Sequence, residues 1–347
     1  MDNTQIKAFG TEGQELPLHE MKIARRALRD NDVAMEILYC GICHSDLHTI
    51  KNDWGDAVYP VVPGHEIIGR ITRVGQQVKS FKVGDLAGIG CIADSCGECD
   101  ECHEHQEQLC NSCTMSFNGV DLISGGRTYG GFSKEYVCEE RYVLHIPPFA
   151  ELAKAAPLLC AGITVYSPLK LYQVAPGKKV GIVGIGGLGH LAIRIAKAMG
   201  GEVTVFTTHA AKADDAYQLG ADHVVVSTDK AAMKGAPKQD IILDTVSALH
   251  NINSYLSKLK TDGSLIVVGL PPEPFQVGSF NLIKGRKRLT GSFIGGIAET
   301  QEVIDFCYKH SIVAESEIIS IDQVNDAFKR LEKGDVKYRF VVDMSTL

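Results

Sequence analysis

A glycine fingerprint constrains this chain more than any other feature, because it falls where an apolar strand turns into an amphipathic helix. Gly184, Gly186 and Gly189 form the pattern G-x-G-x-x-G within "KKVGIVGIGGLGHLAIRIAKAMG". Glycines at this spacing allow a tight turn and let the backbone approach a pyrophosphate at the helix N-terminus, where free N–H groups point outward. The strand–turn–helix context predicts a dinucleotide site rather than a glycine-rich turn without a ligand.

The segments around the fingerprint alternate between short β-branched runs and stretches of helix length. The runs are "EVTVFTT", "HVVVS", "DIILDTV" and "SLIVVGL", and "AELAKAAPLLCAGITVYSPLK" before the fingerprint has the length and spacing of a helix. Strands that alternate with helices indicate a doubly wound parallel sheet, so the fold class is α/β. We place this nucleotide domain at residues 156–295.

The first part of the chain has a different texture. It is rich in Gly and Pro turns, with apolar runs such as "DVAMEILYC" and "EIIGRITRVG" between them. This pattern predicts an irregular β-rich domain over residues 1–155. Near the C-terminus, "KYRFVVDM" predicts a strand that rejoins this domain, so residues 296–347 are assigned to it.

The end of the second predicted strand indicates which cofactor is bound. NAD-binding proteins of this type place an acid about 20 residues after the fingerprint, where it holds the ribose 2′-hydroxyl. Here Thr207 and Thr208 stand at the strand end and Lys212 follows shortly after. Small hydroxyls and a cation suit a 2′-phosphate, which a carboxylate would repel. The sequence therefore favours NADP over NAD.

Composition excludes several partners. The net charge of −7 over 347 residues argues against a nucleic-acid backbone as the main partner. The N-terminal "MDNTQIKAFG" lacks the features of a secretory signal, and no window approaches 18 uninterrupted apolar residues, so no membrane span is expected. We expect a soluble cytoplasmic protein.

Eleven cysteines are many for a reducing compartment, where clustered cysteines bind metal or react. Isolated cysteines are more often small buried apolar residues, which is the interpretation for Cys40, Cys138 and Cys307. A cluster stands in "DSCGECDECHEHQEQLC", with the spacing C-x2-C-x2-C-x7-C. Its members are Cys96, Cys99, Cys102 and Cys110.

Two questions remain open for this cluster from spacing alone. Cys113 competes with Cys110 for the fourth position, and an iron–sulfur cluster would also fit cysteine spacing.

A second constellation lies in "CGICHSDLH" and "YPVVPGHEIIGRITRVG". Cys43 and His65 are candidate zinc ligands there, because a catalytic zinc takes three protein ligands and keeps one position open. Cys160 in "PLLCAG" is well placed to be the third, although spacing does not select it.

The motifs together resemble a known family. "CGICHSDLH", "GHEIIGRITRVGQQV", "PLLCAGITVYSPL", "GIGGLG" and "GDVKYRFVVD" follow one another as in zinc-dependent medium-chain alcohol dehydrogenases. Within that family the chain resembles the cinnamyl-alcohol-dehydrogenase-like branch of NADP-dependent aldehyde reductases, over nearly its whole length. The resemblance implies a GroES-like catalytic domain beside the Rossmann domain, and we expect a homodimer.

The resemblance also implies two zinc ions per chain. Cys43, His65 and Cys160 would bind the catalytic one, and the four-cysteine loop, with Cys110 as its fourth ligand, would hold a structural one in a closed shell. Glu66 would be a nearby acid that can approach the metal, and Asp46 would accept a hydrogen bond from His65. Ser45 and His48 would carry a proton between the reacting oxygen and solvent, while His44 is taken as a surface residue.

The remaining site residues also follow from the resemblance. Arg339 would face the pyrophosphate and pair with Glu66. The residues expected to contact NADP(H) are Thr164, Gly184, Gly186, Gly187, Leu188, Gly189, Thr207, Thr208, Lys212, Ser292, Ile294 and Arg339. The residues expected to line an apolar substrate pocket are Trp54, Cys91, Met115 and Ile294.

The expected activity is reversible reduction of aldehydes to primary alcohols with NADPH. Plant enzymes of the branch carry a large aromatic residue where this chain has the adaptable Met115, so a broad range that includes aromatic aldehydes is expected rather than strict selection for a cinnamyl ring. Two alternatives are a zinc-free NADPH quinone reductase and a non-enzymatic module in which zinc only stabilises the fold. The quinone reductases share the fold but lack both ligand sets. A measurement of metal content distinguishes these hypotheses, because two zinc ions per chain would support the dehydrogenase.

Overall fold

The structure is a computed structural model that describes residues 4–14 and 17–347, so the start of the N-terminal stretch considered above lies outside the described residues. The chain divides into two compact units, which are described separately. The first comprises Met1–Cys160 and Gly295–Leu347, and the second comprises Ala161–Ile294. Ala156–Leu159 forms a 3-10 turn that packs on strands of the first unit, and the division between the two compact units falls after Cys160.

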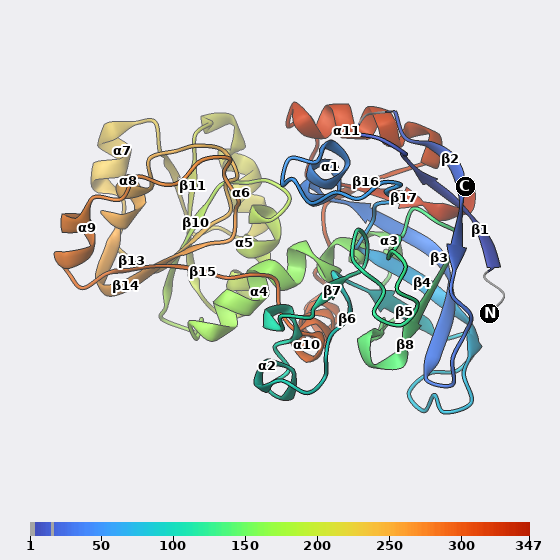
Figure 1. The fold of residues 1–347 in the computed structure, drawn as a ribbon. Helices are drawn as coiled ribbons and strands as arrows, with labels where there is room; N and C mark the ends of the chain where they lie inside the picture. Colours follow the sequence, from blue (N-terminus) through green and yellow to red (C-terminus); the bar gives the residue numbers. More distant parts are fainter. Residues whose placement is uncertain (1–3, 15–16) are drawn as a thin grey trace. The chain divides into compact units, whose positions relative to one another are not determined.

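The second unit is built on a six-stranded parallel sheet with the strand order β12-β11-β10-β13-β14-β15 (Figure 1). Val and Ile fill these strands because both faces of a parallel sheet are covered. The four predicted runs form strands, which confirms the doubly wound α/β fold. The strands are β10 Lys179–Val183, β11 Glu202–Thr207, β12 His223–Val226, β13 Gln239–Asp244, β14 Leu259–Val267 and β15 Arg288–Gly291.

Helices connect the strands of this sheet. The helix that follows the glycine fingerprint, α5, is amphipathic, and it buries Leu191, Ile193 and Ile195 completely. Phe206, Ile242 and Leu265 belong to the core on the sheet. The helices of the unit are α4 Ala161–Leu171, α5 Gly189–Ala198, α6 Ala213–Leu219, α7 Lys230–Gly235, α8 Ile252–Leu256 and α9 Ser279–Ile283, with the 3-10 turn η4 Ala210–Lys212.

The first unit is β-rich, as predicted. Its largest sheet has the order β16-β17-β3-β4-β5-β9, and β8 pairs with β3 outside this path. Two ribbons, β1-β2 and β6-β7, complete it. The strands are β1 Thr4–Gly10, β2 His19–Arg25, β3 Asp32–Ile42, β4 Ile67–Val74, β5 Leu86–Ile89, β6 Ile92–Asp94, β7 Thr114–Met115, β8 Glu135–Glu139, β9 Leu144–His145, β16 Ser316–Ile319 and β17 Arg339–Asp343.

The C-terminal segment contributes two strands to this sheet. β17 pairs antiparallel with β3, with Phe340 opposite Ile42, and parallel with β16. This pairing places Arg339 at the end of β3 that leads into α1, and therefore near the residues of "CGICHSDLH". The helices and turns of the unit are α1 His44–Lys51, α2 Asp100–His103, η1 Glu107–Leu109, η2 Glu140–Tyr142, α3 Leu152–Ala155, η3 Ala156–Leu159, α10 Ile297–Lys309, η5 Ile321–Gln323, α11 Val324–Glu332 and η6 Met344–Thr346.

One predicted element is wrong. The stretch "AELAKAAPLLCAGITVYSPLK" does not form one helix, because α3 and η3 end before Cys160 and α4 begins after it. Pro157 lacks an N–H group and cannot continue the hydrogen bonds of α3. Cys160 at the break has φ −129° and ψ −68°, outside helical geometry. No single helix among the described residues could cross a membrane, although the two halves of this broken stretch together have the length and apolar character to do so.

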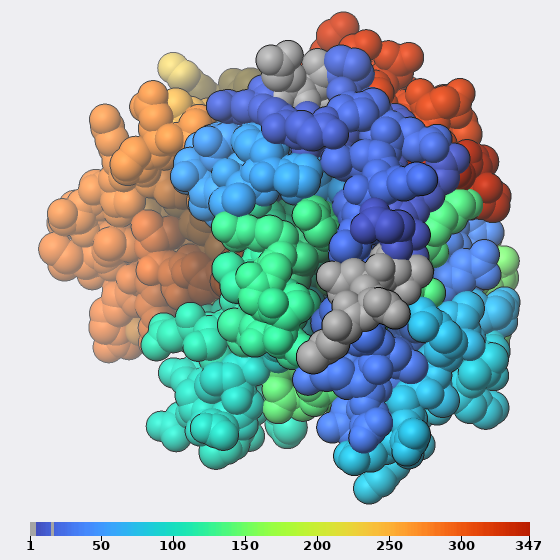
Figure 2. All heavy atoms as spheres, turned by 45° about the vertical axis from the view of Figure 1, so that its right-hand side comes forward, coloured from blue at the N-terminus to red at the C-terminus, as the bar shows by residue number. Residues whose placement is uncertain are grey.

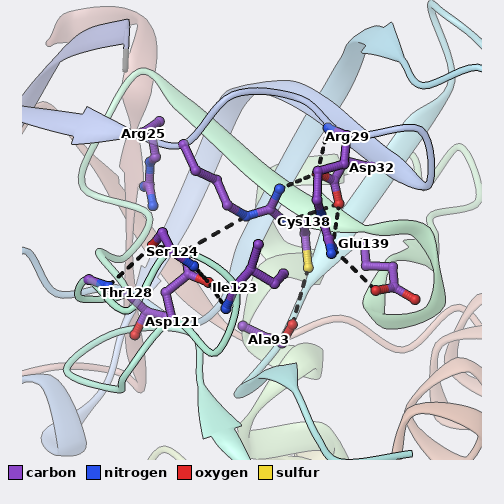
Figure 3. A network of polar contacts seen from close by, with 12 residues as sticks. Arg25, Arg29, Asp32, Ala93, Asp121, Ile123, Ser124, Thr128, Cys138 and Glu139 are labelled. Atoms are coloured by element: carbon purple, nitrogen blue, oxygen red, sulfur yellow. Dashed lines mark hydrogen bonds and ion pairs between the residues drawn. The ribbon is translucent and has the colours of Figure 1, made fainter. Parts of the chain in front are cut away.

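A buried carboxylate fixes the start of β3. Asp32 is fully buried and accepts hydrogen bonds from Arg26 Nη2 at 3.0 Å, Arg29 Nε at 3.1 Å and the Arg29 backbone N–H at 2.8 Å. Burial by itself raises the pKa of Asp32, but the hydrogen bonds from Arg26 and Arg29 outweigh it and lower the pKa. Arg26 Nε also lies 3.7 Å from Asp121. Asp121 accepts hydrogen bonds from Ser124 of the same loop (Figure 3).

Candidate active site and metal centres

A single carboxylate positions two of the predicted zinc ligands. Asp46 lies in the first turn of α1 and is fully buried. Its Oδ2 accepts the backbone N–H of Cys43 at 2.8 Å, and its Oδ1 accepts the Gly64 N–H at 2.9 Å and pairs with His65 Nδ1 at 3.0 Å. Because Nδ1 of His65 donates to Asp46, its Nε2 keeps a free lone pair, as a metal ligand requires.

Four potential ligands converge beside Asp46. The side-chain ligand atoms of Cys43, His65, Glu66 and Cys160 all lie within 4.8 Å of one another. A hydrogen bond from Cys160, followed by the positive charge of Arg339, lowers the pKa of Cys43 well below its usual value despite burial. A thiolate is the form of cysteine that binds zinc. Two sulfurs and one imidazole nitrogen, with a carboxylate alongside, fit a catalytic zinc site.

The carboxylate of Glu66 is engaged by a cation. Arg339 donates from Nη2 to Glu66 Oε1, and both side chains are at most 5% exposed. Although burial opposes it, the negative charge of Glu66 raises the pKa of Arg339. The predicted pair is therefore present, while Glu66 Oε2 and Arg339 Nε are buried without a hydrogen-bond partner among the described residues. A Cβ at Gly41 would collide with Glu66 Oε2, so this glycine makes room for the carboxylate.

The residues predicted to move a proton lie along α1. Ser45 Oγ lies 3.7 Å from Cys43 Sγ, at the ligand cluster. His48 follows one turn later on the same helix face, and its Nδ1 lies 2.7 Å from the Asp53 carboxylate. The side chain of His48 is 32% exposed, so the row from Ser45 to His48 leads from the cluster toward solvent. Trp54 is 45% exposed, and its ring lies 5.3 Å from that of His48.

Cys91 and Phe117 of the first unit border the ligand cluster. Cys91 is 6% exposed, and its thiol hydrogen-bonds with Cys160, which lowers its pKa against the effect of burial. Met115 pairs with Ile92 in the β6-β7 ribbon. Phe117, which the sequence did not single out, stacks on His65 with the ring centroids 5.5 Å apart. Phe117 stands two residues after Met115, so it could have been found as a neighbour of that predicted pocket residue.

The four-cysteine loop forms a second cluster, at the surface of the first unit and drawn in teal-green in Figure 2. The Sγ atoms of Cys96, Cys99, Cys102 and Cys110 all lie within 4.8 Å of one another. Cys96 Sγ is 3.9 Å from Cys102 Sγ and 3.5 Å from Cys110 Sγ. Zinc–sulfur bonds of about 2.3 Å in a tetrahedron place sulfurs about 3.8 Å apart, so this cluster fits a closed zinc site.

Backbone donors favour the thiolate form of one cysteine in this cluster. The N–H groups of Glu98 and Cys99 lower the pKa of Cys96 to about 6. Cys113 does not belong to the group, and burial raises its pKa to about 12, so Cys110 is the fourth cysteine. The predicted burial of the isolated cysteines is confirmed, since Cys40, Cys138 and Cys307 are at most 2% exposed.

In the second unit the fingerprint joins β10 to α5. Gly184 has φ +90°, which favours glycine, and a Cβ at Gly189 would collide with the Gly184 carbonyl. A Cβ at Gly186 would meet nothing within 4 Å, so the backbone is open there. Gly187 and Leu188 complete the turn, and Leu188 is the N-cap of α5. The glycines thus have the roles expected of a loop that receives a pyrophosphate.

The end of β11 carries the predicted phosphate contacts. Thr207 is 4% exposed, and its hydroxyl donates to the His209 carbonyl at 3.4 Å. Thr208 is exposed, with its Oγ1 2.8 Å from His209 Nδ1. Lys212 Nζ donates to the carbonyl of Ile185 in the glycine loop at 3.3 Å, which places its charge beside that loop. His209 is a further exposed side chain at this strand end that the sequence did not single out.

The other predicted cofactor residues are spread over the second unit. Thr164 is buried in α4, and the Ser292 N–H donates to the Val267 carbonyl at 3.1 Å, just after β15. Ile294, which the sequence assigned both to the cofactor and to the pocket, is 8% exposed and has φ +36°.

Comparison with known proteins agrees with this geometry. Residues 29–148 match the alcohol dehydrogenase GroES-like domain, and residues 187–309 match the zinc-binding dehydrogenase family. The chain is 51% identical over 346 residues to aldehyde reductase YahK of Escherichia coli, covering 99% of both chains. Two solved structures are similar over nearly the whole chain. The structure of cinnamyl alcohol dehydrogenase SbCAD4 from Sorghum bicolor has 44% sequence identity and a TM-score of 0.96, with 99% of this chain and 98% of that chain covered. The structure of CAD from Helicobacter pylori complexed with NADP(H) has 40% identity and a TM-score of 0.93, with 99% of both chains covered. The chain therefore belongs to the zinc-binding alcohol dehydrogenases.

Proposed function

We propose that this enzyme reduces aldehydes to primary alcohols, and oxidises the alcohols in reverse, with NADPH and NADP as hydride carriers. The observation that carries the proposal is the cluster of Cys43, His65 and Cys160, which offers a metal three ligands and is separate from the closed four-cysteine set. Such a site keeps a position for a substrate oxygen. A purely structural role for both metals would require neither this position nor the glycine loop.

The residues of the site have distinct roles in the reaction. Zinc, when bound, supplies Lewis acidity at the carbonyl oxygen, and NADPH supplies the hydride. Asp46 holds His65 and Cys43 in place through the hydrogen bonds described above. Ser45 Oγ donates a proton to the oxygen of the reduced substrate, and His48 replaces that proton from solvent.

Each unit has one task in this proposal. The first unit, which corresponds to the predicted domain of residues 1–155 and 296–347, is the catalytic domain, and the second, which corresponds to the predicted domain of residues 156–295, binds NADPH. The bound NADP(H) in the Helicobacter pylori relative supports this assignment. Met115, which is predicted to line the pocket, has an adaptable side chain that favours a broad range of aldehydes, aromatic ones included. A panel of aldehydes with NADPH, followed by the absorbance of the cofactor, tests the function, and no turnover with any aldehyde would contradict it.

Cofactor choice gives a sharper expectation. A charge-assisted contact to the 2′-phosphate contributes roughly 1.5–3 kcal/mol, so one such contact favours NADPH over NADH by roughly 10- to 150-fold. Lys212→Ala should lower kcat/KM with NADPH and leave NADH nearly unaffected, with a smaller loss at high salt. Thr207→Asp should reverse part of the preference, because its carboxylate accepts from the ribose 2′-hydroxyl and repels the phosphate.

Controls keep this experiment decisive. Thr207 is buried, so Thr208→Asp provides the same carboxylate at an exposed position. Lys230→Ala removes an exposed lysine of α7 and should leave the cofactor ratio unchanged. Equal wild-type efficiency with the two cofactors, or an unchanged ratio in Lys212→Ala, would show that the end of β11 does not select NADP.

The assembly and compartment complete the proposal. We infer a homodimer, because β15 pairs with one strand only within the described part of the chain, and exposed apolar side chains cluster in sequence around it. These are Leu270, Phe280, Ile283 and Phe293, between 57% and 72% exposed. We place the enzyme in the cytoplasm, where thiols stay reduced, because six of its cysteines lie in two clusters that could hold a metal ion. Sedimentation equilibrium measures the mass, and a monomer at micromolar concentration would contradict the dimer.

A further inference from the structure

The strongest unassigned feature is a buried acid in the four-cysteine loop. Glu107 opens η1 between Cys102 and Cys110 and is 7% exposed. Its Oε2 accepts the backbone N–H of Ile297 at 3.0 Å. Ile297 is the first residue of α10, a helix of 13 residues. A negative charge at this end of a helix is favourable, because the first N–H groups have no partner within the helix.

The helix has no cap of its own at this end. Its N-cap residue, Gly296, has no side chain that could accept a hydrogen bond from the first turn. Thr300 Oγ1 donates to the Gly296 carbonyl at 2.7 Å, which does not satisfy an N–H group. The carboxylate of Glu107 therefore takes the part that Ser, Thr, Asp or Asn has at other helix starts.

Gly296 also fits against the same loop. A Cβ there would collide with the His105 carbonyl and lie 2.6 Å from Glu107 Oε2. Only glycine allows the loop to approach this closely, and the residue's φ of −72° would accept any side chain. The need for glycine at Gly296 thus comes from the contact with the loop and not from backbone conformation.

The two loop residues that approach Gly296, His105 and Glu107, are hydrogen-bonded to cysteines of the four-cysteine cluster. The His105 N–H donates to the Cys102 carbonyl at 3.2 Å, and the Cys110 N–H donates to the Glu107 carbonyl at 3.1 Å. When the four thiolates close around a metal, they fix the backbone on either side of Glu107. The position of the carboxylate is therefore set by the metal site.

Gly296 and Ile297, which contact the loop, directly follow the point where the chain passes from the second unit to the first. Ile294 is the last residue of the second unit, and Gly295 is the first residue of the C-terminal part of the first unit. We propose that Glu107 is a positioning residue, through which the four-cysteine metal site holds Ser292–Ile297 in the conformation that binds cofactor and substrate. The kinetic part of this inference rests on the proposed function, because Ser292 and Ile294 are its expected cofactor and pocket residues. The structural part, anchoring of the segment, does not depend on it.

The test compares two variants of Glu107 with two controls. Glu107→Ala should keep two zinc ions per chain, raise the KM for NADPH or aldehyde about five- to tenfold, and change kcat less. Glu107→Gln retains an acceptor oxygen and should recover most of the loss. Glu104→Ala removes an exposed acid of the same loop. Gln301→Ala removes the two hydrogen bonds between α10 and His145, so it loosens the same helix elsewhere.

Hydrogen exchange supplies a readout that is independent of activity. Peptides covering residues 292–300 should exchange at least tenfold faster in Glu107→Ala than in wild type or in either control. Cys99→Ala should speed exchange of the same peptides, and the double variant should add little, because both act on one element. Glu107→Ala with wild-type exchange and kinetics would overturn the inference. A wild-type enzyme without aldehyde reductase activity but with the expected exchange pattern would overturn the proposed function and leave the anchor standing.

Discussion

Replacing Cys43 or His65 by alanine should abolish turnover and leave one zinc ion per chain. Each residue supplies one of only three protein ligands at the proposed catalytic site, so its removal leaves the metal too few ligands to be held. The fold should survive, since Cys43 and His65 lie at the ends of elements fixed by Asp46 and by the strand pairing of β3 and β4. Metal analysis, a thermal unfolding curve and the NADPH assay measure the three consequences.

Cys99→Ala should have the opposite profile. A closed four-thiolate site contributes folding free energy directly, so losing it costs stability and solubility. Each 1 kcal/mol corresponds to roughly 2–4 °C in a domain of about 200 residues, and a loss of several kcal/mol lowers the midpoint by on the order of 10 °C. Cys138→Ala removes a buried thiol outside both clusters and should retain two zinc ions. Full stability with lost turnover in Cys99→Ala would mean that the two metal roles are reversed.

Residue type and spacing were sufficient to predict those parts of the site and fold that depend on a short stretch of sequence. The four cysteines within "DSCGECDECHEHQEQLC" come together because the loop is short, and the glycine fingerprint produces its strand–turn–helix from local geometry alone. The fold class is confirmed for the same reason: alternation of strands and helices permits few architectures. Cys160 was different, since only the resemblance selected it as a third ligand.

Contacts between segments that lie far apart in the sequence could not be predicted from the sequence. Phe117 stacks on His65, and Gly41 makes room for Glu66, because β3, β4 and the segment after β7 adopt a particular register and packing. Glu107 reaches Ile297 across 190 positions of sequence, and no local pattern predicts such a contact. Pro157 is a local signal against a continuous helix, but it does not locate the break, because Pro168 of the same stretch lies inside α4.

Removing the Ser45 hydroxyl should cost about 10²–10⁴-fold in turnover, the usual effect of losing general acid–base assistance. Ser45 Oγ lies 3.7 Å from Cys43 Sγ, so it is positioned to reach an oxygen at the open place of the ligand cluster. His48→Ala should cost less, at most roughly tenfold, because its ring is part-exposed and water can take over a proton transfer near solvent. The measurement is the single-turnover rate of Ser45→Ala and His48→Ala, in which cofactor release does not limit the signal.

Ser45→Thr is the matched control, because it keeps a hydroxyl at the same position on α1 and should recover much of the rate. Both Ser45 variants should bind two zinc ions, since Ser45 is not in either ligand cluster. A Ser45→Ala enzyme with full single-turnover rate would remove this hydroxyl from the mechanism. If His48→Ala lost more than Ser45→Ala, the proton would have to reach the oxygen from the imidazole without passing through Ser45, and the order of the two residues along α1 would no longer describe its path.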